Sequence, residues 1–195
     1  MQEIQKNGVL KNNRYLVSFS APQYLKNETN MERLTLRCDA VQIPGMTFAT
    51  IDGSSRFGYG ATESNPYGVI FDDAVLTFLL DSKADVHHFF HRWTNSIVNY
   101  TARGQSAMKD RLGTVANMYT YEVGYKDKYS TDITITVYND AATDKTSPGT
   151  PVMEVKLFRA YPKNLPSLDM SWNNSNDLLR LPITFSYTDF DIKYL

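Results

Sequence analysis

The sequence predicts a mainly β protein, a sandwich or barrel of seven or eight strands with one α-helix packed on its side. Two observations support this prediction. In most apolar stretches, apolar and polar residues alternate, which is the period of a pleated strand. Only the stretch 86–97 carries its apolar residues at clear helical spacing. We therefore expect several strands, and one helix that covers part of their apolar surface.

The strongest local pattern is the run from Val69 to Asn99. Its first part predicts a well-covered strand, whose inward face carries Ala74, Leu76, Phe78 and Leu80. Ser82–Asp85 resembles a capping box and predicts that a helix begins there. The apolar stripe of this helix contains Val86, Phe89, Phe90, Trp93 and Ile97, whereas Arg92 and Asn95 lie off it. The remaining strands must cover this strand and helix.

Alternation also predicts strands on both sides of this unit. The inward-facing residues would be Tyr15, Val17 and Phe19 in 14–20; Leu34, Leu36, Cys38 and Ala40 in 34–40; Tyr119, Tyr121, Val123 and Tyr125; Ile133, Ile135 and Val137 in 132–139; Met153, Val155 and Leu157 in 152–158; and Leu168, Met170 and Trp172. Residues 140–151 are predicted to form a loop, and 160–164, which contain Pro162, a turn.

The C-terminal strand changes phase. One face first carries Leu181, Ile183, Phe185 and Tyr187, and the apolar positions then become Phe190, Ile192 and Tyr194. Because a shift of one residue moves side chains to the opposite face, we expect a bulge or bend near Thr188 and Asp189. A long apolar terminal edge invites aggregation unless another strand pairs with it, and pairing between copies in a closed ring is one solution.

Length and composition limit the possible functions. The 195 residues, of which 42% are hydrophobic, predict a single domain over 1–195 with a substantial core. The net charge of −1 gives no general basic surface for gripping nucleic acid or acidic lipid, although a protein that only surrounds DNA would have the same balance. One cysteine excludes an internal disulfide framework and a cysteine-rich zinc site.

Three segments are expected outside the regular core. Residues 1–13 predict a polar N-terminal arm without a secretory signal, and no apolar run approaches the roughly 20 residues that span a bilayer. We therefore expect a soluble chain made in a cytosol. The glycine-rich connection 46–68 is long enough to suggest a binding arm or an ordered hairpin. We interpret the stretch 100–131, which begins with polar and basic residues, as an insertion.

No residue pattern indicates catalysis, a cofactor or a metal. His87 and His91 lie four residues apart on the predicted helix, but no third ligand follows from the spacing. Asp72 and Asp73 are adjacent in a predicted strand and so would point to opposite faces. Cys38 lies on an apolar face, which favours a packed thiol. The sequence has no Gly-x-Ser-x-Gly motif, and residues 54–60 lack the ending of a phosphate-binding loop.

The order of these segments resembles a known family. The segment 36–45 precedes a glycine-rich region, then come 71–73, the strand 75–80, a helix with Phe90 and Trp93, the segment 154–162, and 168–172 before the alternating terminal strand. This order resembles the tail tube proteins of contractile-tailed bacteriophages, from about Arg14 to the end of the chain. The stretch 104–150 is longer than the family pattern, which keeps the related baseplate tube initiator open.

The resemblance implies a structural virion protein rather than an enzyme, with no cofactor. Six copies would form a ring whose inner strands make a continuous β-barrel, and the rings would stack through extended loops such as 46–68. Sheath and baseplate proteins would be partners, and DNA and the tape measure protein would occupy the channel. The protein would be located in the virion tail, after assembly in the host cytoplasm.

Three other functions remain open at this stage. The chain could be a tube initiator or tube-terminating ring protein of the same family. It could be the tube protein of a type VI secretion system, which shares the ring architecture. It could also be a carbohydrate-binding or hydrolytic β-sandwich, a function that only the surface aromatic residues support.

Overall fold

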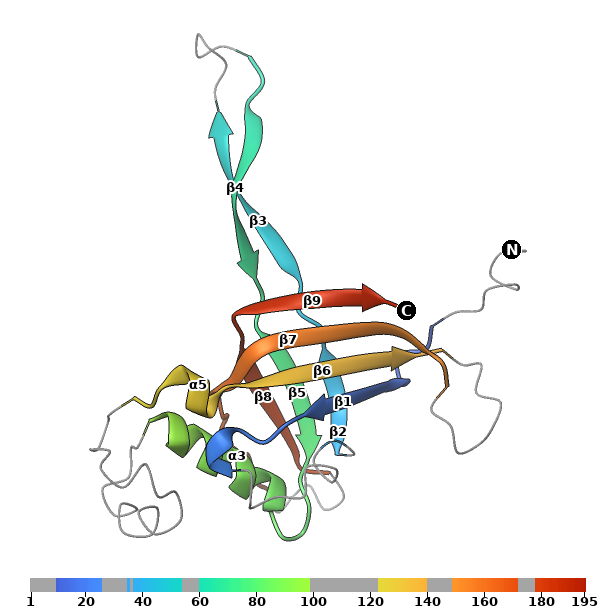
Figure 1. Ribbon diagram of the computed structural model, residues 1–195, viewed down its shortest axis with the longest axis vertical. Helices are drawn as coiled ribbons and strands as arrows, with labels where there is room; N and C mark the ends of the chain where they lie inside the picture. Colours follow the sequence, from blue (N-terminus) through green and yellow to red (C-terminus); the bar gives the residue numbers. More distant parts are fainter. Residues whose placement is uncertain are drawn as a thin grey trace.

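The computed structural model describes residues 10–25, 35, 37–53, 60–98, 123–139, 149–171 and 178–195. Figure 1 shows the arrangement of their nine strands and three helices. The strands are β1 (Tyr15–Phe19), β2 (Cys38–Gln42), β3 (Met46–Gly53), β4 (Glu63–Phe71), β5 (Ala74–Leu79), β6 (Thr131–Tyr138), β7 (Pro151–Asn164), β8 (Arg180–Ser186) and β9 (Asp189–Tyr194). The helices are η1 (Gln23–Leu25), α3 (Asp85–Ile97) and α5 (Lys126–Tyr129).

Seven of the strands form one antiparallel sheet that folds over at β7. The front half contains β1, β6, β7 and β9, and the back half contains the end of β7 with β8, β5 and β2. In Figure 1 the back half runs across the front half. Strands that switch between crossed sheets through a bend are the usual corners of such packings. The predicted mainly β fold with a flanking helix is confirmed, and the sheet is open in the single chain.

The bend in β7 lies at Arg159. Residues before it pair with β6 and β9, and Tyr161 to Asn164 pair with β8. Arg159 has a φ of 52°, in the left-handed region that a residue with a side chain enters only when its surroundings hold it there. The predicted turn at 160–164 is therefore wrong, because the strand continues. Pro162 is tolerated because this end of β7 is an edge, with β8 as its neighbour.

The core lies between the two halves and under α3. The predicted stripe of α3 is confirmed, with Val86, Phe89, Phe90 and Trp93 at most 2% exposed, while Ile97 is half-buried. The ring of Phe90 lies 4.9 Å from that of Phe78 and 6.1 Å from that of Phe185, so the helix joins β5 to β8. Burial of each large side chain contributes about 1.5–3 kcal/mol before entropy is counted. Asn95, predicted to lie off the stripe, is also buried.

The start of α3 differs from the predicted capping box. Ala84 is the N-cap residue, in a left-handed conformation, and no side chain caps the helix from that position. Instead, the Asp85 amide donates to Oδ1 of Asp81 at 2.9 Å. The other oxygen of Asp81 lies 2.7 Å from the Arg37 guanidinium, and this hydrogen bond lowers the pKa of Asp81. Asp81 therefore takes the role that the pattern gave to Ser82, because it also has a cation to hold it in place.

Several predicted strands are confirmed with adjusted ends. β1 lies within 14–20, β6 begins one residue before the predicted 132–139, and β7 covers 152–158. Ala74, Leu76 and Phe78 are fully buried, as predicted, and Leu80 is partly buried. β2 begins only at Cys38, and a bulge between Cys38 and Ala40 leaves Ala40 exposed. Val41 packs against the core in its place. Leu34 and Leu36 lie outside the described residues.

The C-terminal bend is also confirmed, because β8 ends at Ser186 and β9 begins at Asp189. The predicted short strand with Leu168 and Met170 is wrong: 165–171 form no strand, and Met170 is 76% exposed. Trp172, Tyr119 and Tyr121 lie outside the described residues. Val123 and Tyr125 are exposed and precede α5, which the sequence did not predict.

The short helix α5 ties the end of the predicted insertion into the core. Tyr129 is 8% exposed, and its carbonyl accepts a hydrogen bond from Nε1 of Trp93 at 2.7 Å. The described part of the chain contains no helix long and apolar enough to cross a membrane.

The substitution Phe90→Ala should lower the free energy of unfolding by about 3–5 kcal/mol, because it leaves a cavity where α3, β5 and β8 meet. Urea denaturation followed by circular dichroism measures this change. Met170→Ala is the matched control at an exposed position and should change stability by no more than about 0.5 kcal/mol. A loss below about 1 kcal/mol for Phe90→Ala would contradict the central place of this ring.

Candidate functional site

Two free strand edges border the front half. In the described chain β1 pairs only with β6, and β9 pairs only with β7. The amide of Leu195 donates to the carbonyl of Val152 at 2.9 Å, so this end of β9 is bonded to β7. Because amides alternate in direction along a strand, the amide of Tyr194 points away from β7. β9 therefore presents backbone donors and acceptors to another strand.

Within 46–68, the described residues form a paired hairpin, which is one of the two structures predicted for this region. β3 pairs with β4 from Met46 opposite Phe71 to Gly53 opposite Glu63, with a bulge between Ala49 and Thr50. Figure 1 shows the hairpin projecting away from the folded sheet, past β9. It carries seven of the sixteen exposed large hydrophobic residues of the described chain: Met46, Phe48, Ile51, Tyr67, Val69, Ile70 and Phe71. An isolated two-stranded ribbon is marginal in water, so this surface requires a partner.

An aromatic cluster holds the base of the hairpin. The ring of Phe71 lies 5.2 Å from that of Phe190 and 6.3 Å from that of Tyr187. The Tyr187 hydroxyl donates to the carbonyl of Asp72 at 2.6 Å, and the Asp72 amide donates to Gly45 at 3.1 Å. The cluster of Phe71, Tyr187 and Phe190 thus joins the hairpin to the turn that leads into β9.

Asp72 and Asp73 are not in a strand, contrary to the sequence prediction. They form the junction between β4 and β5. Asp73 lies 2.7 Å from Nζ of Lys163 at the end of β7. Both residues therefore fix the junction rather than form a carboxylate pair for catalysis.

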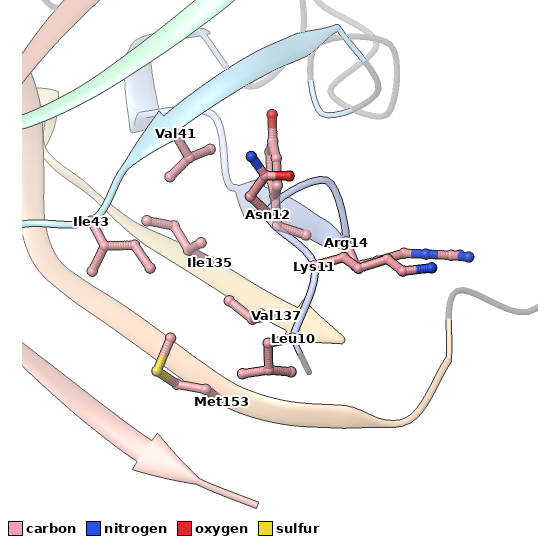
Figure 2. Close-up of a pocket in the computed structure, with 10 residues that line it drawn as sticks. Leu10, Lys11, Asn12, Arg14, Val41, Ile43, Ile135, Val137 and Met153 are labelled. Carbon is pink, nitrogen blue, oxygen red and sulfur yellow. The ribbon is translucent and has the colours of Figure 1, made fainter. Parts of the chain in front are cut away.

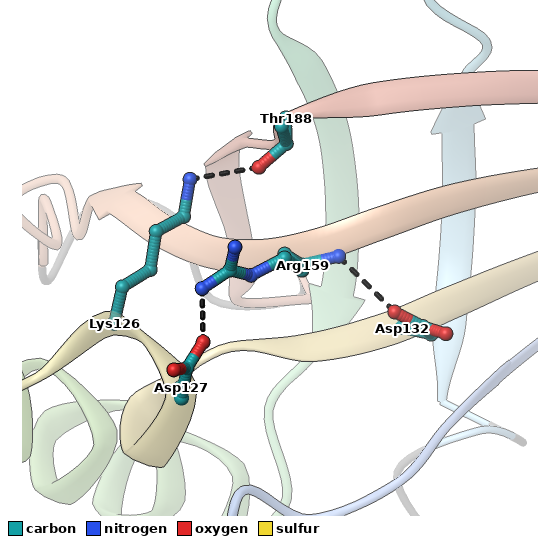
Figure 3. A network of polar contacts seen from close by, with 5 residues as sticks. All are labelled: Lys126, Asp127, Asp132, Arg159 and Thr188. Atoms are coloured by element: carbon teal, nitrogen blue, oxygen red, sulfur yellow. Dashed lines mark hydrogen bonds and ion pairs between the residues drawn. The ribbon is translucent and has the colours of Figure 1, made fainter.

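A polar network covers the bend in β7 (Figure 3). The Arg159 amide donates to Asp132 at 3.1 Å, and its guanidinium pairs with Asp127 of α5. Lys126 donates to Oγ1 of Thr188 at 2.8 Å. The short helix α5 thus contacts both connections between the two halves. Asp127 contacts the bend in β7, and Lys126 contacts the turn between β8 and β9.

Among the described residues, no other element covers the outer face of the front half, and this face carries both acidic and basic side chains. Along β7 and β9 the side chains opposite the core are acidic and basic in turn, and the register sets Glu154 opposite Lys193 and Lys156 opposite Asp191. On β6 the corresponding positions are Thr134 and Thr136. Opposite charges on facing strands stabilise the pairing and leave little net charge on the face.

A groove opens between the two halves, beside β1. It encloses about 320 Å³ and is lined by Leu10, Lys11, Asn12, Arg14, Tyr15, Val41, Ile43, Ile135, Val137 and Met153. Figure 2 shows the apolar side chains of β2, β6 and β7 on its walls, with Lys11 and Arg14 extending to one side. No sequence pattern could have shown it, because four distant segments build it.

The described residues that were considered for chemistry lie on three separate elements: α3, β2 and the junction between β4 and β5. The rings of His87 and His91 stack at 6.2 Å, and burial, with the two neighbouring histidines, lowers the pKa of His91. Among the residues that the structure describes, no group of three His, Cys, Asp or Glu could hold a metal ion. Burial, followed by the charge of Asp39, raises the pKa of Cys38 to about 12. The candidate functional surfaces are therefore the free strand edges, the hairpin and the groove, and each is suited to contact with another chain.

Comparison with protein families supports this conclusion. The family model described as "Phage tail tube protein" matches residues 10–193. The chain belongs to this family. It is a structural protein of the phage tail tube, as the resemblance implied, and the family favours this over the carbohydrate-binding alternative.

Solved structures share the fold of this tail tube protein. One is from the baseplate of the anti-feeding prophage, with a TM-score of 0.61 and 13% identity over 96% of this chain and 97% of the other. Another is from the sheath–tube complex of the PVC extracellular contractile injection system, with a TM-score of 0.59 and 17% identity over 100% and 98%. A third, from the anti-feeding prophage cap, has a TM-score of 0.58 and 14% identity over 96% and 92%. A search of curated proteins finds no match.

Cys38 of the tail tube protein should be almost unreactive in the folded state. Its S–H donates to the carbonyl of Ala40, and a pKa raised from 9.0 to about 12 reduces the thiolate at pH 8 on the order of a thousandfold. Labelling with iodoacetamide, followed by mass spectrometry, should be at least a hundredfold slower in the native protein than in denaturant. Similar rates in both conditions would contradict a packed thiol.

Proposed function

We propose that this protein is the repeating subunit of the tail tube and that six copies close into a ring through pairing of β9 with β1 of the next copy. The observation that supports this is the pair of free edges on one half-sheet, β1 and β9, with β6 and β7 between them. A head-to-tail contact that closes generates a ring, and a closed barrel removes the exposed edges.

The bare face of the front half would line the channel. The back half, α3 and the aromatic core occupy its other face, and a barrel interior that must remain open has no room for them. In the ring, Thr134, Thr136, Glu154, Lys156, Asp191 and Lys193 would then face the lumen. Paired opposite charges suit a wall past which DNA must slide, because a strongly basic wall would bind phosphates tightly.

The other partners follow from the family. We assign the outer surface, on the side of α3, to the sheath, and the ends of the tube to baseplate and terminating proteins. The tape measure protein and then DNA would occupy the channel. Residues 1–195 would act as one domain, with 1–13 as an arm, 100–131 as an insertion and the β3–β4 hairpin as the link between rings. Assembly would take place in the host cytoplasm, before the tail joins the virion.

Negative-stain electron microscopy of the purified protein over a range of concentrations tests this function. Long hollow tubes are expected for the main tube subunit. Rings or monomers that never polymerise would overturn that assignment and indicate an initiator or terminator that needs a baseplate neighbour.

The substitution Tyr194→Pro should abolish ring closure while leaving the monomer folded. Proline removes the one amide of this residue, which points away from β7, and edge strands tolerate proline. Tyr194→Ala is the matched control, because it loses the same side chain but keeps the amide. Analytical ultracentrifugation should find monomers for the proline variant and assemblies for the alanine variant. Equal assembly of both would show that this edge is not the ring contact.

Replacement of residues 46–70 by an Asn-Gly turn should leave a folded protein that forms rings but no tubes. The replacement keeps Gly45, Phe71 and Asp72, so the aromatic cluster at the base remains. Circular dichroism checks the fold, and electron microscopy measures tube length. Tubes of normal length would contradict the assignment of the hairpin to contacts between rings.

A further inference from the structure

The groove beside β1 is an apolar surface that the single chain leaves open to water. Ile43 and Leu10 at its border are 37% and 52% exposed, whereas Ile135 on its floor is fully buried. Lys11 and Arg14 lie along its rim. The groove is thus apolar inside and basic at one side, which defines the chemistry of the segment that would fill it.

We propose that this groove binds the β3–β4 hairpin of a second copy, an inference that rests on the proposed function. The hairpin of the same copy cannot fill this groove. β3 begins only three residues after Ile43 and runs away from the seven-stranded sheet, past β9 (Figure 1). Eight residues of extended strand carry its end about 25 Å away. The segment and the groove can therefore meet only between copies.

The two surfaces are complementary. The pairs Met46–Phe71 and Phe48–Val69 share one face of the hairpin. Phe71 packs on Phe190 of the same copy, while Met46, Phe48 and Val69 are each more than half exposed. Farther along the same face lies Asp52, whereas Glu63, opposite Gly53, lies on the other face of the ribbon. The Asp52 carboxylate accepts a hydrogen bond from Ser64 of the facing strand, which fixes an acidic group near the end of the described hairpin. An apolar face followed by the Asp52 carboxylate matches an apolar groove with Lys11 and Arg14 at its rim.

The proposed ring contact brings the two surfaces together. The base of the hairpin packs on Phe190 at the start of β9, so the hairpin crosses the edge that receives the next copy. That copy would add its β1, and Arg14 and Tyr15 at the start of β1 also line the groove. In a ring, the grooves and the bases of the hairpins therefore lie along the same seams, and a hairpin that projects from one ring would reach a groove of the next ring.

Cysteine cross-linking between two differently labelled preparations tests this proposal. In a Cys38→Ala background, one preparation carries Phe48→Cys in the hairpin and the other carries Leu10→Cys in the groove. When the two co-assemble under mild oxidation, a cross-linked dimer should form in tubes and be absent from monomers held below the assembly concentration. Because each preparation carries one cysteine, a mixed dimer can only join two copies.

The control pairs Phe48→Cys with Met170→Cys, which is exposed but does not line the groove. This pair should give at least tenfold less mixed dimer. If Cys38→Ala does not assemble, the native background can be used once the labelling experiment above shows that Cys38 reacts slowly. Tubes that form without the Phe48–Leu10 product, or with equal product in the control, would overturn the groove contact while leaving the tube function intact. Absence of tubes from the unmodified protein would instead overturn the proposed function.

A charge exchange gives an independent readout. Lys11→Glu should raise the concentration needed for assembly about fivefold, and so should Asp52→Lys, since each places like charges side by side. The double variant should recover at least half of this loss on a logarithmic scale. Light scattering at low salt measures all three. Independent, additive losses in the double variant would contradict the pairing of rim and hairpin.

Discussion

The structure depends on one strand that belongs to both halves of the sheet. β7 pairs with β6 and β9 before Arg159 and with β8 after it, so the bend at that residue sets how the two halves face each other. The left-handed backbone of Arg159 persists because Asp132 holds its amide and Asp127 its guanidinium. The core, the groove and the bare outer face all result from this fold-over. A flat continuation of the same strands would leave the core side chains exposed and would form no groove.

The chain divides its apolar residues between two roles. One set is fully buried between the halves and under α3, and holds the single copy together. The other set lies on a two-stranded ribbon with little else to pack against. A monomer gains nothing from the second set, since exposed apolar surface favours unwanted association. Its presence is understandable only in an assembly, which agrees with the family of the chain.

Regular periodicity in the sequence predicted the core well. The stripe from Val86 to Trp93 identified the helix, and the alternation around Phe78 identified the central strand. In both elements the apolar side chains recur at the period of the element and face the same core. Prediction failed where a distant contact overrules local pattern. Pro162 suggested a turn, because the sequence alone does not show that this residue lies on a strand edge, where proline is tolerated. Ser82 suggested the helix cap, because the sequence alone does not show that Arg37 lies beside Asp81 and holds it in the capping position. The groove was invisible for the same reason, since Leu10, Ile43 and Met153 meet only in the folded chain.

The aromatic cluster of Phe71, Tyr187 and Phe190 has a consequence for the order of growth. It joins the arm of each copy to the strand that would receive a neighbour. Pairing of that strand restricts the turn before it, and through these rings it restricts the direction in which the arm points. A copy within a closed ring would thus offer a better-oriented arm than a free copy, with less orientational entropy left to lose on contact. Growth from an existing end would then be faster than the start of a new tube, which is the kinetic behaviour of a nucleated polymer.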